Sequence, residues 1–277
     1  MAEITAAKVK AFRDRTGLPL MDCKRALKEA GGDEDQAYEA LRKAGEQLAD
    51  KRAGRETAFG RFGLYCGSDK TVGSMVELKC ESAPVAANEE VIQLANDLAQ
   101  QLAEGPGAAT AEELLEQPSP SKPGTTLSEQ KADLFNRIRE VFNVGRMVKL
   151  DSTCGGYTHN AGTIAGVLLA IEGGSDELAK DVSMHIAAMR PDSLSVEDLP
   201  ADVVSKEREI LRAAALQEGK PENIVDKMVD GRMRNFYAQR VLLEQPYVKD
   251  DKLTVGEFAA ENGMKIKQFV HWELGKE

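Results

Sequence analysis

The sequence has few of the features from which membrane segments and targeting signals are built. No stretch of its 277 residues approaches the 18 consecutive apolar residues that a membrane-spanning helix needs. The first residues, MAEITAAKVKAFRDR, lack the apolar core of a secretory signal, and the acidic Glu3 and Asp14 argue against a transit peptide. We therefore expect a cytoplasmic protein without a membrane span.

The cysteines are few and are not spaced for a metal or redox site. They form no Cys-x-x-Cys pair, which argues against a zinc site and a thioredoxin-like redox pair. In a reducing compartment we expect free thiols that mostly fill buried space. An enzyme that uses Cys23 or Cys80 as a nucleophile is an alternative, and it would need a thiol pKa lowered by a positive neighbour. The four cysteines are Cys23, Cys66, Cys80 and Cys154.

Sequence signatures of catalysis and cofactor binding are missing as well. The three histidines form no His-x-x-x-His pair, and neither a Gly-x-x-x-x-Gly-Lys-Ser/Thr loop nor a Gly-x-Ser-x-Gly elbow occurs. We therefore predict no metal, no cofactor and no covalent chemistry. His185 lies in an otherwise apolar helical stretch, residues 183–188. Two interpretations of it stay open, namely helix–sheet packing and a functional contact.

Positive charge is also scarce relative to negative charge. Lys and Arg number 36 against 46 Asp and Glu, which gives a net charge of −10. This balance argues against a simple electrostatic grip on nucleic acid, because such binding neutralises phosphates with Lys and Arg. The 14 aromatic residues do not interleave with a basic run, as stacking on bases would require. Without an assembled catalytic constellation, the chain is expected to be a binding protein.

Three helices are expected in residues 1–55, where they form a small separate domain. Thr5 is a suitable N-cap for the first helix. Asp33, followed by Gln36, resembles a capping box at the start of the third helix. The second helix carries one apolar stripe. Leu20 and Met21 stand at its start, and they either pack in the core of this domain or form an exposed anchor for a partner.

The pattern then changes to an α+β subdomain, assigned to residues 56–140. Residues 59–80 are rich in β-forming residues around a polar centre, which predicts an antiparallel hairpin. Apolar periodicity predicts helices at 88–103 and from Ser128 to about Phe142. A stretch rich in Pro and Gly connects these two helices.

A second, related α+β subdomain is assigned to residues 141–277. A hairpin at 152–174 and a helix at 176–189 repeat the earlier plan, so we expect a second antiparallel sheet. Helical patterns over about 202–243, broken by a Gly-Lys-Pro turn, predict an inserted antiparallel helical hairpin. Alternation at 265–274 predicts a last strand that closes the second sheet.

Several short segments carry a more specific signal. They are ITAAKVK (4–10), RDRTG (13–17), MDCKRALKEAGGD (21–33), YTH (157–159), MHIAA (184–188), GKP (219–221), KMVDGRM (227–233) and QPYV (245–248). In this order, and covering essentially the whole chain, they closely resemble the elongation factor Ts family.

The resemblance implies an N-terminal domain like a ubiquitin-associated domain, a core of two α+β subdomains and a coiled-coil insertion. It implies a guanine nucleotide exchange factor that binds elongation factor Tu with GDP bound or without nucleotide, and promotes GDP release for exchange with GTP. Nucleic acid and membrane are not implied as partners, and a dimer of heterodimers is compatible with the resemblance. Such a factor makes and breaks no covalent bond.

The resemblance also carries site residues onto this chain. His185 matches the core histidine near the loop that intrudes into elongation factor Tu. The positions that match contacts of the N-terminal domain with the GTPase domain are Lys10, Arg13, Leu20 and Met21.

One departure from the family pattern concerns the exchange step. The family usually has Thr-Asp-Phe-Val where this chain has Ser82, Ala83, Pro84 and Val85. The family's Asp and Phe press toward the GTPase and help to dislodge its Mg²⁺. The alternative to an exchange factor is therefore a binding partner or chaperone of elongation factor Tu with weakened exchange activity.

Overall fold

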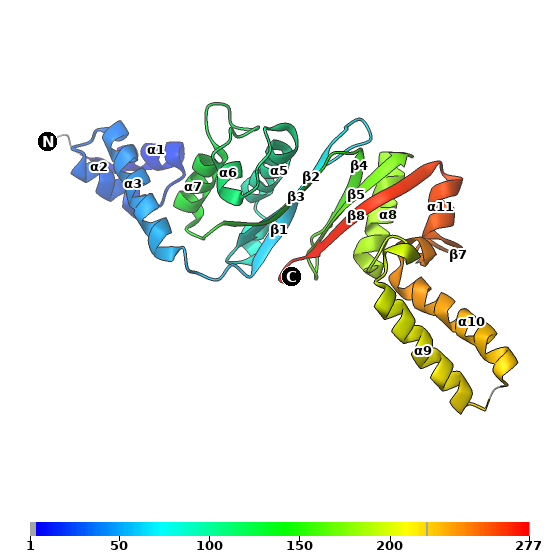
Figure 1. The fold of residues 1–277 in the computed structure, drawn as a ribbon. Helices are drawn as coiled ribbons and strands as arrows, with labels where there is room; N and C mark the ends of the chain where they lie inside the picture. Colours follow the sequence, from blue (N-terminus) through cyan, green and yellow to red (C-terminus); the bar gives the residue numbers. More distant parts are fainter. Residues whose placement is uncertain (1–3, 220, 277) are drawn as a thin grey trace. The chain divides into compact units, whose positions relative to one another are not determined.

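A computed structural model describes residues 4–219 and 221–276 (Figure 1). The contacts between its residues divide the chain into two compact units. The first contains the chain up to Tyr65, Ser74–Val148 and the residues from Leu274 onward, and the second contains Cys66–Gly73 and Lys149–Glu273. Helices combine with antiparallel strand pairs, which confirms the α+β prediction. In the part of the chain that the structure describes, no helix is long and apolar enough to cross a bilayer.

The chain begins with three helices, α1 (Ala6–Thr16), α2 (Leu20–Glu29) and α3 (Glu34–Arg52). The predicted caps form, because the Thr5 side chain accepts from the Lys8 amide and Asp33 accepts from the first amides of α3. Apolar side chains of all three helices make one small core centred on Phe12 and Leu27.

The first sheet has the strand order β1-β2-β3, formed by β1 (Phe59–Tyr65), β2 (Gly73–Cys80) and β3 (Asn143–Leu150). Strands β1 and β2 pair antiparallel, which confirms the predicted hairpin. Strand β3 was not predicted. The predicted domain boundary at residue 141 precedes it, although β3 belongs to this sheet.

Helices α5 (Glu89–Glu104), α6 (Ala111–Leu115) and α7 (Leu127–Ile138) accompany this sheet. Apolar side chains of α5 and α7 share one core with strand β2. The predicted extension of α7 to Phe142 is wrong, because Arg139 takes the left-handed conformation with φ 68° and ends the helix. That conformation costs a non-glycine residue about 1 kcal/mol.

The second unit has its own sheet of order β4-β5-β8, and helix α8 (Asp176–Met189) packs against β4 and β5. The strands are β4 (Cys154–His159), β5 (Ala165–Gly173) and β8 (Met264–Glu273). The predicted hairpin, helix and last strand are confirmed, but the predicted regular alternation of the last strand is not. The register of β5 with β8 shifts between Ala170 and Ile171, and the pairing then continues to Gly173 and Met264.

A long helical hairpin follows α8, made of α9 (Ala201–Gln217) and α10 (Glu222–Arg240) (Figure 1). Its helices pack around Ala215, Val225 and Met233, which form a cluster of their own. The second helix ends at Arg240, before the predicted limit of 243, because the backbone turns extended at Val241. Lys220, in the predicted Gly-Lys-Pro turn, lies outside the described residues.

Short elements complete the second unit, and the sequence did not predict them. The 3₁₀ turns are η1 (Val196–Asp198) and η2 (Leu242–Glu244), and they are followed by β6 (Pro246–Tyr247), β7 (Asp250–Thr254) and α11 (Val255–Glu261). The β6–β7 hairpin brings Tyr247 onto Phe258 of α11, with the ring centroids 4.1 Å apart.

Candidate partner-binding site

The turn between α1 and α2 exposes two large apolar side chains. Gly17, with φ 69°, ends α1, and Pro19 precedes α2. Leu18 turns into the core, whereas Leu20 and Met21 are 49% and 69% exposed. The interpretation of Leu20 and Met21 as core residues is therefore wrong, and they form a small apolar projection.

Two cations lie on the neighbouring helix α1, where Lys10 and Arg13 are exposed. Arg13 makes a 3.9 Å ion pair with Asp14, and both side chains are more than half exposed. Such a pair contributes little to stability, so Arg13 can exchange its partner at small cost. Arginine is among the side chains that are enriched in protein-binding surfaces.

The segment Ser82–Val85 starts a short helix, α4 (Ala83–Ala86), directly after strand β2. The Ser82 hydroxyl donates to Glu140 Oε1 at 2.7 Å, and the Arg61 guanidinium donates to the Ala86 carbonyl at 2.8 Å. Ala83 and Pro84 are exposed. This places a small, well-held projection at the end of the strand, and it carries neither a carboxylate nor an aromatic ring.

His185 lies on α8 and is completely buried. Its Nδ1 accepts a hydrogen bond from the Val248 amide at 3.2 Å, so Nε2 carries the proton and donates to Gln245 Oε1 at 2.9 Å. Burial lowers the pKa of His185 from its ordinary value of 6.5. The side chain therefore fits the packing interpretation, as a neutral group that holds the β6–β7 turn.

Val248, at this turn, is 53% exposed. An ion pair of Lys249 with Asp181 of α8 holds the same turn at 2.6 Å. Val248 lies in the matching segment 245–248, but nothing in the sequence marks it as a site residue, since a lone valine after Gln-Pro-Tyr has no signature of exposure. Because His185 itself is buried, it could affect a partner only indirectly, by holding the backbone of the exposed Val248.

The cysteines do not provide a reactive thiolate. All four are free thiols. Burial raises the pKa of Cys23 above its ordinary value and that of Cys80 to about 11. A nucleophilic thiol needs the opposite shift. The alternative of a thiol enzyme has no support in this environment.

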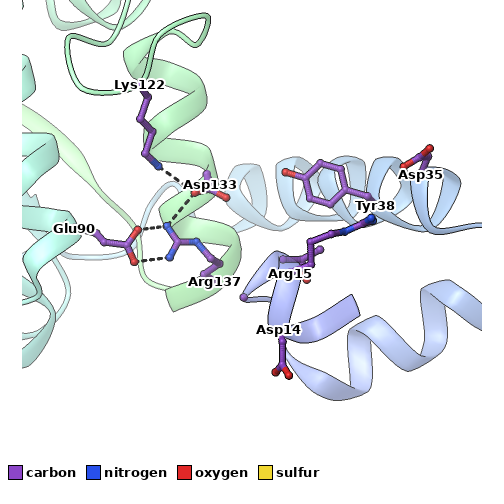
Figure 2. Close-up of a pocket in the computed structure, with 10 residues that line it drawn as sticks. Asp14, Arg15, Asp35, Tyr38, Glu90, Lys122, Asp133 and Arg137 are labelled. Atoms are coloured by element: carbon purple, nitrogen blue, oxygen red, sulfur yellow. Dashed lines mark hydrogen bonds and ion pairs between the residues drawn. The ribbon is translucent and has the colours of Figure 1, made fainter. Parts of the chain in front are cut away.

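A hollow of about 660 Å³ in the first unit holds paired charges (Figure 2). Arg137 binds both carboxylate oxygens of Glu90 and also reaches Asp133 at 2.9 Å, while Lys122 lies 3.5 Å from Asp133. Because these charged side chains are paired with one another, they would exert only a weak electric field on a substrate in the hollow. Among residues 4–219 and 221–276, no group of three or more His, Cys, Asp or Glu could hold a metal ion.

The fold therefore defines an α+β protein with several modules, and exposed apolar side chains project from two of its turns. Residues 84–276 match the family model described as "Elongation factor TS". The chain is 40% identical over 285 residues to "Elongation factor Ts" of Aquifex aeolicus (strain VF5), with 98% of each chain covered. It is 41% identical to the same factor of Methylococcus capsulatus, covering 99% of this chain and 92% of that one.

These matches show that the chain belongs to the elongation factor Ts family. Its place is therefore in the elongation stage of protein synthesis. The contacts of the individual site residues with a partner follow as proposals.

Proposed function

We propose that the chain binds elongation factor Tu in the GDP-bound and nucleotide-free states and promotes release of GDP. The observation that carries this proposal is the exposure of Met21, with Leu20 next to it in the sequence. The resemblance to the family implies that these two positions contact the GTPase domain. A flexible thioether side chain on a rigid turn is well suited to fill a pocket on a partner protein. Lys10 and Arg13 would supply charge at the rim of this contact.

Exchange needs no covalent chemistry, only a difference in affinity. If the chain binds nucleotide-free elongation factor Tu more tightly than the GDP complex, GDP affinity falls by the same factor. A difference of about 4 kcal/mol changes the GDP affinity roughly a thousandfold. The binding surface alone can therefore perform the function.

Two further surfaces complete the proposal. Ser82–Val85 would face the Mg²⁺ site of the GTPase, where small displacements are costly because Mg²⁺ demands near-octahedral geometry. Ala83 and Pro84 offer a small apolar wedge there in place of a carboxylate and a ring. Val248, held by His185, would contact the partner from the second unit. Because this wedge is smaller than that of the family pattern, Leu20 and Met21 would contribute a larger share of the binding free energy.

The test is release of a fluorescent GDP analogue from elongation factor Tu under excess unlabelled GDP. We expect the wild-type chain to accelerate release strongly. Met21→Ala should weaken binding by about 1–3 kcal/mol, seen as a higher concentration for half-maximal release. Its thermal midpoint should stay unchanged, because Met21 contributes to no core.

Met189→Ala is the matched control, since Met189 is also exposed, at 44%, at the end of α8. It should behave as wild type in both measurements. No acceleration by the wild-type chain, with binding shown by pull-down, would replace exchange by the alternative of a non-exchanging partner. A loss of stability in Met21→Ala with unchanged affinity would contradict the anchor role.

A further inference from the structure

The turn that carries Leu20 and Met21 is tied to the C-terminal end of α7. The Arg139 Nη2 atom donates to Asp22 Oδ2 at 2.8 Å, and both side chains are three-quarters buried. Asp22 follows Met21 directly in the sequence. The link therefore lies one residue from the most exposed apolar side chain of the turn.

A second contact holds the other end of the same turn. A Cβ added at Gly17 would lie 2.8 Å from Cδ of Arg137, so the aliphatic part of Arg137 lies against this glycine. Arg137 is itself fixed by Glu90 of α5 and Asp133 of α7 (Figure 2). The turn 17–22 is thus bounded at both ends by arginines of the first α+β subdomain.

The backbone of Arg139 indicates that its side chain is needed there. Its φ of 68° is in the left-handed region, which glycine adopts without strain and arginine does not. The Arg139 carbonyl accepts a hydrogen bond from Arg52 Nη1, at the end of α3, at 2.7 Å. One strained residue therefore holds both α2, through its side chain, and α3, through its carbonyl.

We propose that Arg139 is a positioning residue, which fixes the turn 17–22 on the first subdomain and sets the direction in which Leu20 and Met21 face a partner. The inference rests on the proposed function, because these two residues are the proposed contact. Without the guanidinium, Leu48 and Ala49 of α3 still pack on the subdomain core, so the helical module stays attached. The turn can then pivot, and its ordering on binding costs affinity without any lost contact.

The test is Arg139→Gly, which removes the guanidinium and also relieves the backbone strain. Its thermal midpoint should equal or exceed that of the wild type. Backbone ¹⁵N relaxation should show added nanosecond motion in residues 17–29. In the GDP-release assay the concentration for half-maximal acceleration should rise about fivefold, with the maximal rate unchanged, because the wedge is intact.

Asp22→Ala, which removes the acceptor of Arg139, should give the same changes in relaxation and in half-maximal concentration, and the double variant should be no worse than either single one. Arg25→Gln is the matched control, because Arg25 also binds Asp22, at 2.8 Å, but from within α2. It should match the wild type in relaxation and in release.

The outcomes separate the two proposals. A wild-type chain that does not accelerate release refutes the proposed function, while relaxation still tests the link. Relaxation and half-maximal concentration unchanged in Arg139→Gly overturn the positioning role. The same loss in Arg25→Gln overturns it too, since the charge around Asp22 would then matter rather than the link to α7.

Discussion

At the scale of single residues, His185 is the side chain whose protonation state matters most to the candidate site. Its Nδ1 must stay unprotonated to accept from the Val248 amide, while Nε2 donates to Gln245. Gln245 is oriented in turn, because its Nε2 donates to the Gln239 carbonyl at 3.2 Å. A proton on Nδ1 would place two N–H groups against each other and release the exposed Val248.

This arrangement predicts a pH-dependent loss of stability. Burial lowers the pKa of His185 in the folded chain below the unfolded value of 6.5. Between these two pKa values the unfolded chain binds the proton more readily, so stability falls as pH falls below about 6.5. The slope from this one group approaches about 1.4 kcal/mol per pH unit. Calorimetric melting between pH 7.5 and pH 5 measures it.

His185→Asn separates this contribution from that of the carboxylates. Asparagine offers an acceptor near the position of Nδ1 but does not titrate. We expect it to be somewhat less stable than the wild type at pH 7.5, with a smaller loss on acidification. If the thermal midpoints of the two proteins fall equally between pH 7.5 and pH 5, His185 titrates normally in the fold and the prediction is wrong.

At the scale of the elements, replacing a glycine by alanine should have opposite effects on stability in two helices. Gly45 in α3 is buried, and a Cβ there would lie 1.7 Å from Oδ1 of the buried Asn136 on α7. Gly45→Ala should lower the free energy of unfolding by about 1–2 kcal/mol, because overpacking outweighs the better helix propensity of alanine. Calorimetric midpoints measure the change.

Gly231→Ala in α10 is the control with the same chemical change. Apart from its chain neighbours and the backbone of α10 itself, no atom lies within 4 Å of a Cβ added there. Only helix propensity therefore acts, and stability should rise by up to about 1 kcal/mol. An equal gain in both variants would mean that α3 does not pack closely on α7.

The elements show how far the sequence determines the fold. Periodicity and caps predicted α1, α2, α3, α5 and α8 because their apolar faces and capping residues are local signals. The end of α7 was missed because Arg139 adopts a conformation that sequence assigns to glycine. Strand β3 was missed for another reason, since all of its residues are partly buried and no alternation of buried and exposed positions marks it.

The site was predictable in part. Leu20 and Met21 were identified as candidates by their place at a helix start, but their exposure depends on Leu18 taking the core position instead. The hold of His185 on Val248 spans 63 residues of sequence, and the link of Asp22 to Arg139 spans 117. Pairings at such separations leave no local pattern to detect.

At the scale of the whole molecule, the helical hairpin is the clearest separable part. Its apolar cluster of Ala215, Val225, Val229 and Met233 is distinct from the cluster around Val167 and Leu169 that forms the core of the second unit. Ion pairs such as Arg208 with Asp230 join its two helices and are largely exposed, so they add little stability. The hairpin therefore contributes little to the stability of the rest of its unit.

Replacing residues 202–239 by a short Gly-Ser linker should leave that unit folded. The amides of Asp192 and Ser193 donate to the Arg240 carbonyl, at 2.7 and 3.2 Å, so the base of the hairpin is held independently of its length. We expect the thermal midpoint to change by less than about 3 °C. Leu242→Ala, which empties a buried site in the core of the unit, should instead cost about 2–5 kcal/mol. Loss of cooperative melting after the deletion would contradict this prediction. It would mean that the core of the second unit needs the hairpin in order to fold, although the two apolar clusters are separate.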